Sequence, residues 1–195
     1  MTRTDTSAWP CAIARTADLI GDGWTLLIMR EACLGTRRFE EFQRTLGTGR
    51  NILTQRLNML VDDGLLTRVP YQEHPVRHEY RLTDKGRDVY PILAAMAAFG
   101  DKWLLGDDRP VVLHHTTCDH DMHAVVTCSV CAEPLDIRSV RARPGPGYSE
   151  ESVQRGADVT RDELVAAPAA PVGVAPFTSV ALDTLIDGSA PCPRD

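Results

Sequence analysis

Residues 50–64 read Arg-Asn-Ile-Leu-Thr-Gln-Arg-Leu-Asn-Met-Leu-Val-Asp-Asp-Gly, and their pattern indicates the type of domain. Its apolar residues recur at the spacing of a helix and form one face: Ile52, Leu53, Leu57, Leu60 and Val61. The other face carries arginine and uncharged polar residues in place of the usual Glu and Lys: Arg50, Asn51, Thr54, Gln55 and Asn58. Such side chains pair with base edges and phosphates, so the stretch predicts a DNA-recognition helix that ends at Gly64.

The residues around this helix predict a winged helix-turn-helix. Shorter helices are expected at residues 11–20, 24–34 and 39–46, and a Gly-Thr-Gly turn separates the last of them from residue 50. Two extended runs, residues 65–71 and 77–82, follow the recognition helix and are joined by a polar loop with a proline. This pattern predicts a β-hairpin, and a hairpin in this position is a wing.

Ten residues of this region are predicted to contact DNA. Those of the recognition helix are expected in the groove: Arg50, Asn51, Thr54, Gln55 and Arg56. Asn and Gln suit adenine, whereas Arg suits guanine or phosphate. Phosphate contacts are expected from arginines before the third helix and on the hairpin: Arg37, Arg38, Arg68, Arg77 and Arg81. An ordinary solvated polar face is the alternative, and the neighbouring helix and hairpin argue against it.

The charge of the chain is divided unevenly. The net charge is −6, but residues 1–105 hold 14 basic and 13 acidic residues, whereas residues 106–195 hold 7 and 14. A local basic patch matters more for DNA binding than the total charge. The acidic C-terminal part therefore does not exclude DNA as the partner of the N-terminal part.

A further helix is expected after the hairpin, capped by Thr83 and kinked or divided at Pro91. Its apolar residues follow helical spacing: Val89, Ile92, Leu93, Met96, Phe99 and Trp103. An apolar helix face at the end of a small domain is more easily buried against a second copy of the chain than against the core of its own domain. The sequence therefore predicts a homodimer.

Six blocks in this order and spacing resemble the HxlR family of winged-helix transcriptional regulators: Pro10–Arg15, Gly21–Ile28, Gly35–Phe39, Leu53–Leu57, Asp63–Leu66 and Tyr80–Gly86. The resemblance covers about residues 10–105, roughly half the chain. It implies a dimeric cytoplasmic DNA-binding regulator, commonly a repressor, that reads a pseudo-palindromic operator.

Cys11 is a candidate redox sensor. A helix N-terminus lowers the pKa of a thiol, and Arg15 lies one turn away. Members of the similar family sense quinones or oxidants through a cysteine at this location, and Cys33 is a possible second thiol. The alternative is a small buried hydrophobic residue, the usual environment of a free cysteine.

A cluster of cysteines and histidines follows the winged helix. Cys128 and Cys131 form a Cys-x-x-Cys pair, and Cys118 with His115, His120 or another histidine would complete a structural Zn²⁺ site. Short strands are expected at residues 111–113, 124–127 and 135–140, which would make a zinc-ribbon-like unit. Asp119 and Ala132 stand where zinc ribbons usually have Gly, so a metal-free pair or a disulfide is the alternative.

The sequence thus predicts an α+β protein in three parts: a winged helix-turn-helix with a dimerisation helix at residues 1–106, a small β-rich unit at 107–147, and an Ala/Pro-rich, partly flexible tail at 148–195. The absence of a membrane-spanning stretch and of a signal-peptide pattern predicts a cytoplasmic protein. The expected function is a repressor released by a small molecule or a thiol-redox signal. A zinc-dependent enzyme and a protein-interaction module are the alternatives; no catalytic motif supports the enzyme.

Overall fold

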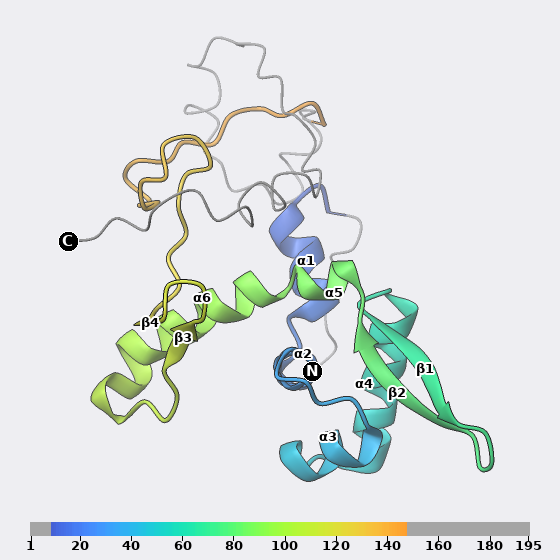
Figure 1. Cartoon of the computed structure of the whole chain (residues 1–195). Coiled ribbons are helices and arrows are strands. Elements are labelled where there is room, and N and C mark those ends of the chain that lie inside the picture. The colour runs from blue at the N-terminus through green and yellow to red at the C-terminus, as the bar shows by residue number, and fades with distance from the viewer. Residues whose placement is uncertain (1–8, 148–195) are drawn as a thin grey trace.

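The computed structural model describes residues 9–147 and has a winged helix-turn-helix followed by a small hairpin (Figure 1). Four helices come first: α1 (Ala12–Ile20), α2 (Gly23–Cys33), α3 (Phe39–Leu46) and α4 (Arg50–Asp62). The wing consists of β1 (Leu66–Gln72) and β2 (Arg77–Leu82), which pair antiparallel. This arrangement confirms the predicted fold class and places the four helices and the wing within a residue or two of their predicted bounds.

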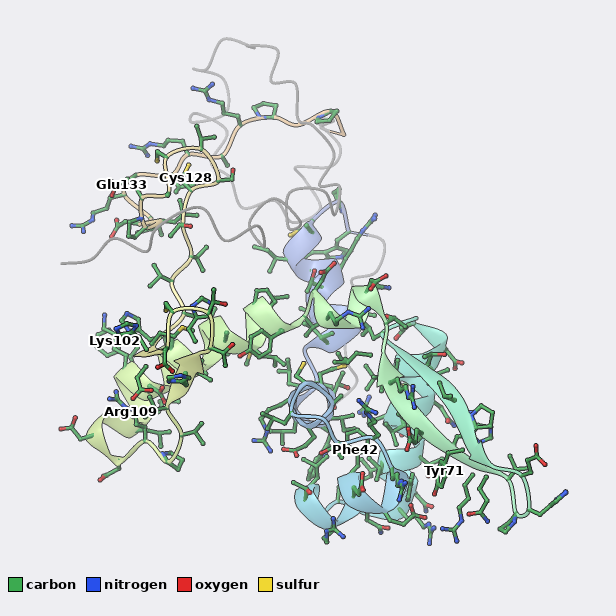
Figure 2. All side chains as sticks on the ribbon, in the orientation of Figure 1. Phe42, Tyr71, Lys102, Arg109, Cys128 and Glu133 are labelled. Carbon is green, nitrogen blue, oxygen red and sulfur yellow. The ribbon has the colours of Figure 1, made fainter. Side chains whose placement is uncertain are left out.

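The core of the winged helix lies between α2, α3 and α4. Leu53, Leu57 and Leu60 of α4 are almost completely buried, and they share one cluster with Ile28 of α2 and Phe42 of α3. Figure 2 shows Phe42 inside this part of the molecule. Its ring meets that of Tyr80 on β2 edge-on, with centroids 6.4 Å apart, which ties the wing to the helices.

The inward face of α4 is narrower than predicted. Ile52 was expected on the apolar face, but its side chain is 42% exposed, so that prediction is wrong. At 100° per residue, position 52 lies on the flank of a face centred on Leu53, Leu57 and Leu60. Gly64 follows the helix with a φ of +70°, which confirms the predicted left-handed cap.

The segment after the wing is divided at Pro91, as predicted. A short helix, α5 (Asp84–Arg87), is capped by Thr83, whose hydroxyl accepts the Gly86 N–H at 3.0 Å. Helix α6 (Tyr90–Gly100) then begins with Pro91 in its first turn, where a missing N–H costs nothing. It continues into a π-helical turn (Asp101–Leu105) and a 3₁₀ turn (Gly106–Asp108).

The C-terminal unit differs from its predicted strands. Its regular hairpin consists of β3 (Leu113–His115) and β4 (His120–Met122), while residues 124–127 and 135–140, predicted as strands, form no ladder. One isolated bridge, Thr127 with Pro134, joins those regions. Their alternating apolar residues are exposed, so no core face fixes them as strands. The predicted tail at 148–195 lies outside the described residues.

No helix among residues 9–147 is both long and apolar enough to cross a membrane.

Gly86 lies so close to the backbone of Leu65 that a larger residue would not fit. A Cβ at this position would lie 2.1 Å from the Leu65 carbonyl oxygen, whereas a Cβ at Gly23 would meet nothing within 4 Å. We expect Gly86→Ala to lower the free energy of unfolding by about 1–3 kcal/mol, as overpacking does. Gly23→Ala is the matched control and should not destabilise. Urea denaturation followed by circular dichroism measures both, and equal stabilities of the two variants would contradict the packing described here.

Candidate nucleic-acid interface

The exposed face of α4 carries the predicted base-reading residues. Arg50, Asn51, Thr54 and Gln55 are all exposed, and Asn58 is half-buried one turn further along. Asn51, Gln55 and Asn58 lie opposite the buried leucines, because successive residues of a helix are rotated by 100°. The surface of α4 therefore offers amide groups along its centre and Arg50 and Thr54 at its edge.

The wing lies beside α4 and is joined to it by polar contacts (Figure 1). Arg68 of β1 donates a hydrogen bond to the Asn58 side-chain oxygen, and its guanidinium lies 5.9 Å from the centre of the Tyr80 ring. These contacts keep a positive charge next to the exposed face of α4.

The start of α3 is fixed by a carboxylate. Glu41 accepts the backbone N–H of Arg38 at 3.0 Å and that of Arg37 at 3.3 Å, and the bond from Arg38, followed by that from Arg37, lowers the pKa of Glu41. The Arg37 carbonyl in turn accepts the Tyr80 N–H at 2.8 Å. The two arginines are thus held between α3 and the wing.

The arginines of this surface differ in how far their charge is compensated. Glu79 of β2 pairs with Arg38 at 3.6 Å and with Arg81 at 3.0 Å. Within residues 9–147, Arg37, Arg50 and Arg77 make no ion pair. Arg50 packs its guanidinium over the Phe39 ring at 5.3 Å, an arrangement that keeps its charge available.

Arg56 makes an ion pair within the protein. Its guanidinium pairs with Asp22 at 3.1 Å, and both side chains are half-buried. The second carboxylate oxygen of Asp22 accepts the N–H groups of Trp24 and Thr25 and so caps α2. Arg56 therefore joins α4 to α2, and its predicted contact with DNA stays a prediction.

The two cysteines of the winged helix, Cys11 and Cys33, have different surroundings. Cys11 precedes α1 and is half-buried, and Arg15 donates to the Trp9 carbonyl at 2.7 Å rather than to the sulfur. Cys33 ends α2, and burial raises the pKa of its thiol. Both are free thiols.

The five predicted metal ligands form two groups. His115 Nδ1 lies 3.2 Å from the Cys118 sulfur in the β3–β4 turn, and Cys128 and Cys131 share a second turn. In that second turn, the N–H groups of Cys131 and Val130 lower the pKa of the Cys128 thiol. His120 instead bonds the Cys118 carbonyl. Among the described residues no three such side chains converge on one point.

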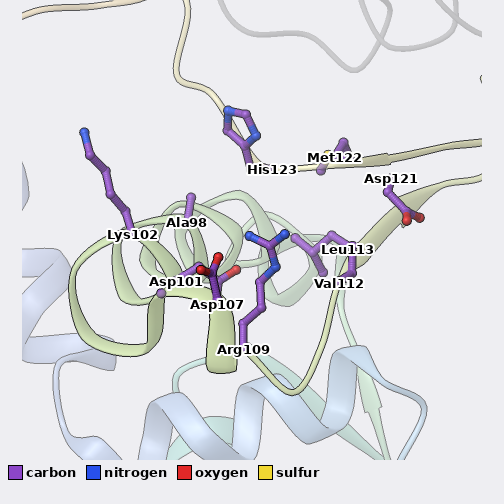
Figure 3. A pocket seen from close by; sticks show the side chains of 11 residues that line it. Ala98, Asp101, Lys102, Asp107, Arg109, Val112, Leu113, Asp121, Met122 and His123 are labelled. Carbon is purple, nitrogen blue, oxygen red and sulfur yellow. The ribbon is translucent and has the colours of Figure 1, made fainter.

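Two hollows adjoin α6. One, of about 470 Å³, lies between the end of α6 and the β3–β4 hairpin, and it is lined by charges of both signs, including Asp101, Lys102 and Arg109 (Figure 3). The other, of about 430 Å³, lies between α1 and α6, and its walls are almost wholly apolar, with Ile13 and Met96 among them.

Comparison with known proteins identifies the architecture. The HxlR-like helix-turn-helix family profile matches residues 19–108. An uncharacterized HTH-type transcriptional regulator of Mycobacterium tuberculosis is 43% identical over 138 residues, which cover 70% of this chain and 87% of the relative. A Bacillus subtilis regulator of the same description, YvaP, is 35% identical over 92 residues, which cover 46% of this chain and 84% of YvaP.

Two solved structures resemble the chain beyond the winged helix. PA1607, described as a candidate transcription factor, has a TM-score of 0.65 and 37% identity and covers 71% of this chain and 98% of its own. PA1374 of Pseudomonas aeruginosa, described in the same way, has a TM-score of 0.54 and 37% identity over 74% of this chain and 99% of its own. The family profile ends at residue 108, and the matches to PA1607 and to the mycobacterial relative are longer than the chain up to that residue. Both matches therefore extend into residues 107–147, the Cys/His unit.

Proposed function

The chain belongs to the HxlR-like helix-turn-helix family of transcriptional regulators. We propose that it is a dimeric repressor that reads a pseudo-palindromic operator through α4. The observation that carries the proposal is the exposed face of α4, with Asn51 and Gln55 opposite the buried leucines. The enzyme and the interaction module have no comparable observation in their favour. A DNA-binding regulator acts where the chromosome lies, so we expect this one in the cytoplasm.

The proposed contacts with DNA are of two kinds: some read base edges, and others bind the phosphate backbone of the DNA. A helix in the major groove presents its side chains to base edges, and the amides of Asn51 and Gln55 suit the N6 and N7 positions of adenine. Arg50 lies at the edge of that face, Arg37 precedes α3, and Arg77 begins β2. None of the three pairs with a described carboxylate, so they suit phosphates. Sequence preference would come from the amides and affinity from the arginines.

This division predicts two different mutant phenotypes. On an operator selected from random DNA, we expect Gln55→Ala to lower affinity about tenfold, which is within the 1–3 kcal/mol of a bidentate amide–adenine pair, and to spare non-specific binding. Arg77→Ala should weaken both kinds of binding and reduce the slope of log affinity against log salt by about 1. Fluorescence anisotropy in a salt series measures these effects.

Arg109→Ala is the matched control for Arg77→Ala, because Arg109 lies outside the winged helix and should leave the slope unchanged. An operator bound equally well by wild type and Gln55→Ala, or no selected operator at all, would contradict the proposal.

A second copy is expected to cover α1 and α6. Phe99 of α6 and Trp103 of the π-helical turn that follows it are exposed, and Ile13 of α1 is 81% exposed. The apolar hollow between α1 and α6 continues this surface. Covering such side chains stabilises a complex by about 25 cal/mol for each Å² of apolar surface removed from water. A two-fold dimer would also present two copies of α4 to two half-sites.

The dimer predicts that one charge on this surface separates the copies. Phe99→Asp should convert the dimer to a monomer in sedimentation-velocity experiments and weaken operator binding along with it. Val76→Asp is the matched control, since Val76 is as exposed as Phe99 (64% and 61%) but lies at the wing tip, so this variant should stay dimeric. A wild-type protein that sediments as a monomer at micromolar concentration would overturn the proposed dimer.

Cys11 is the proposed signal-receiving thiol, because it precedes α1 at the edge of the surface that a second copy would cover. Diamide removes two electrons and two protons from two thiols as they form a disulfide, and the second thiol is either Cys33 or the other copy's Cys11. We expect diamide to reduce the operator affinity of wild type and to leave that of Cys11→Ser unchanged.

Cys33→Ser decides between the two partners: a retained response assigns the second thiol to the other copy, and a lost response assigns it to Cys33. Operator affinity that is indifferent to diamide in wild type would contradict thiol sensing and leave a small-molecule inducer as the releasing signal. The charged hollow beside α6 would then be the first place to search for that molecule (Figure 3).

A further inference from the structure

Two turns of the C-terminal unit have the same backbone geometry. One runs from His115 to Asp119 and the other from Cys128 to Ala132. In each, the N–H of the fifth residue donates to the carbonyl of the first at 2.9 Å. In each, the fifth residue also has a left-handed backbone, with φ of 59° at Asp119 and 60° at Ala132.

The left-handed residues point to a constraint on the turns. An L-residue other than Gly avoids this conformation because its Cβ crowds the following carbonyl oxygen. Within residues 9–147, Asp119 and Ala132 are the only residues other than Gly that adopt it. Two strained residues at equivalent positions of two turns indicate that the turn shape itself is needed. These are also the positions where zinc ribbons usually have Gly.

The pairing around the turns repeats as well. His115 pairs with His120 across the β3–β4 hairpin, and the Cys128 N–H donates to the Glu133 carbonyl at 2.9 Å, which joins the same two positions of the second turn. The bridge between Thr127 and Pro134 extends that second pairing by one residue. The chain has therefore built one local structure twice within about twenty residues.

The first and fourth residues of each turn bring metal-ligand atoms together. His115 Nδ1 and the Cys118 sulfur lie 3.2 Å apart, close to the edge of about 3.5 Å that nitrogen and sulfur span in a tetrahedral Zn²⁺ site. In the second turn, Cys128 and Cys131 hold the first and fourth positions, the Cys128 carbonyl accepts the Ala132 N–H at 2.9 Å, and the Val130 N–H points at the Cys128 sulfur at 3.5 Å. Backbone N–H groups of this kind also stabilise zinc-bound thiolates.

We propose that the two turns close on one another around a single Zn²⁺ held by His115, Cys118, Cys128 and Cys131. Each turn supplies two ligands, and the three thiols release three protons to solvent as they bind, while His115 binds as the neutral imidazole. Four protein ligands leave no open position, so the ion is structural. His115 is chosen over His120 because it occupies the first position of its turn, as Cys128 does in the second turn, and its Nδ1 already lies beside the Cys118 sulfur.

Closure requires the two turns to approach each other. In the structure each turn is formed, but Cys128 lies away from the β3–β4 hairpin, at the far end of the segment 123–126 (Figures 1 and 2). That segment forms no helix or strand and is mostly exposed. An extended chain spans about 3.3 Å per residue, so the segment is long enough to fold back and set one turn against the other. The ion would supply the packing that this exposed unit lacks.

The test is metal content and ligand identity in the full-length chain. Protein purified with a phosphine reductant, loaded with Zn²⁺ and desalted should hold one zinc per chain by mass spectrometry. Loading with Co²⁺ should give the strong visible bands of a tetrahedral thiolate site. Cys118→Ser and Cys128→Ser should lose the stoichiometric metal, and His115→Asn should lose it or shift the cobalt bands.

Two variants outside the proposed ligand set serve as matched controls. His120→Asn and Cys33→Ser should hold one metal per chain with an unchanged cobalt spectrum. Circular dichroism of every variant checks that the winged helix, whose core contains none of these residues, is still folded. Zinc below one per chain in reduced wild type, a Cys128–Cys131 disulfide that persists under reductant, or metal lost in His120→Asn but kept in His115→Asn would each overturn the proposal. None of these readouts involves DNA, so they are independent of the regulator proposal.

Discussion

The burial of three leucines on one side of α4 is the constraint on which the rest of the winged helix depends. Leu53, Leu57 and Leu60 are at most 1% exposed, and burying each is worth about 1.5–3 kcal/mol. Rotating α4 by one residue would expose part of this surface, so its rotation about its own axis is fixed. The same rotation turns Asn51 and Gln55 outward, and the ion pair between Arg56 and Asp22 holds the flank of the helix to the start of α2. The face that we propose to read DNA is thus a consequence of the core.

Charge then separates the two ends of the molecule. The wing and α4 lie at one end, while the Cys/His unit lies at the other (Figure 1). Residues 106–195 have twice as many acidic as basic residues, which would repel a phosphate backbone. Arg50 lies on α4 itself, Arg37 precedes α3, and Arg77 begins the second strand of the wing. Glu79 compensates Arg38 and Arg81, so only part of the arginine content is available to DNA. A net negative chain can in this way present a positive binding surface.

The sequence predicted what depends on local pattern and missed what depends on distant partners. The bounds of α3 and β2 followed from apolar spacing and turn residues, and the break at Pro91 followed from the chemistry of proline. The ion pair of Arg56 was missed because Asp22, its partner, lies 34 residues away and no local signal joins them. Strands at 124–127 and 135–140 were wrong because alternation predicts a strand only where a partner strand and a core face exist. The left-handed residues after Cys118 and Cys131 looked like departures from a zinc ribbon, and only the backbone showed that Asp119 and Ala132 take the shape that Gly usually provides.

A double-mutant cycle between protein and DNA tests whether the amides of α4 read adenine in the major groove. Each adenine of a selected half-site would be replaced by 7-deazaadenine, which lacks the N7 acceptor, and affinities of wild type, Asn51→Ala and Gln55→Ala would be measured on every duplex. We predict one adenine per half-site whose replacement weakens wild type about tenfold but does not further weaken the variant that lacks its partner, as one bidentate pair requires. Replacements that weaken all three proteins equally, or none of them, would contradict base reading by α4.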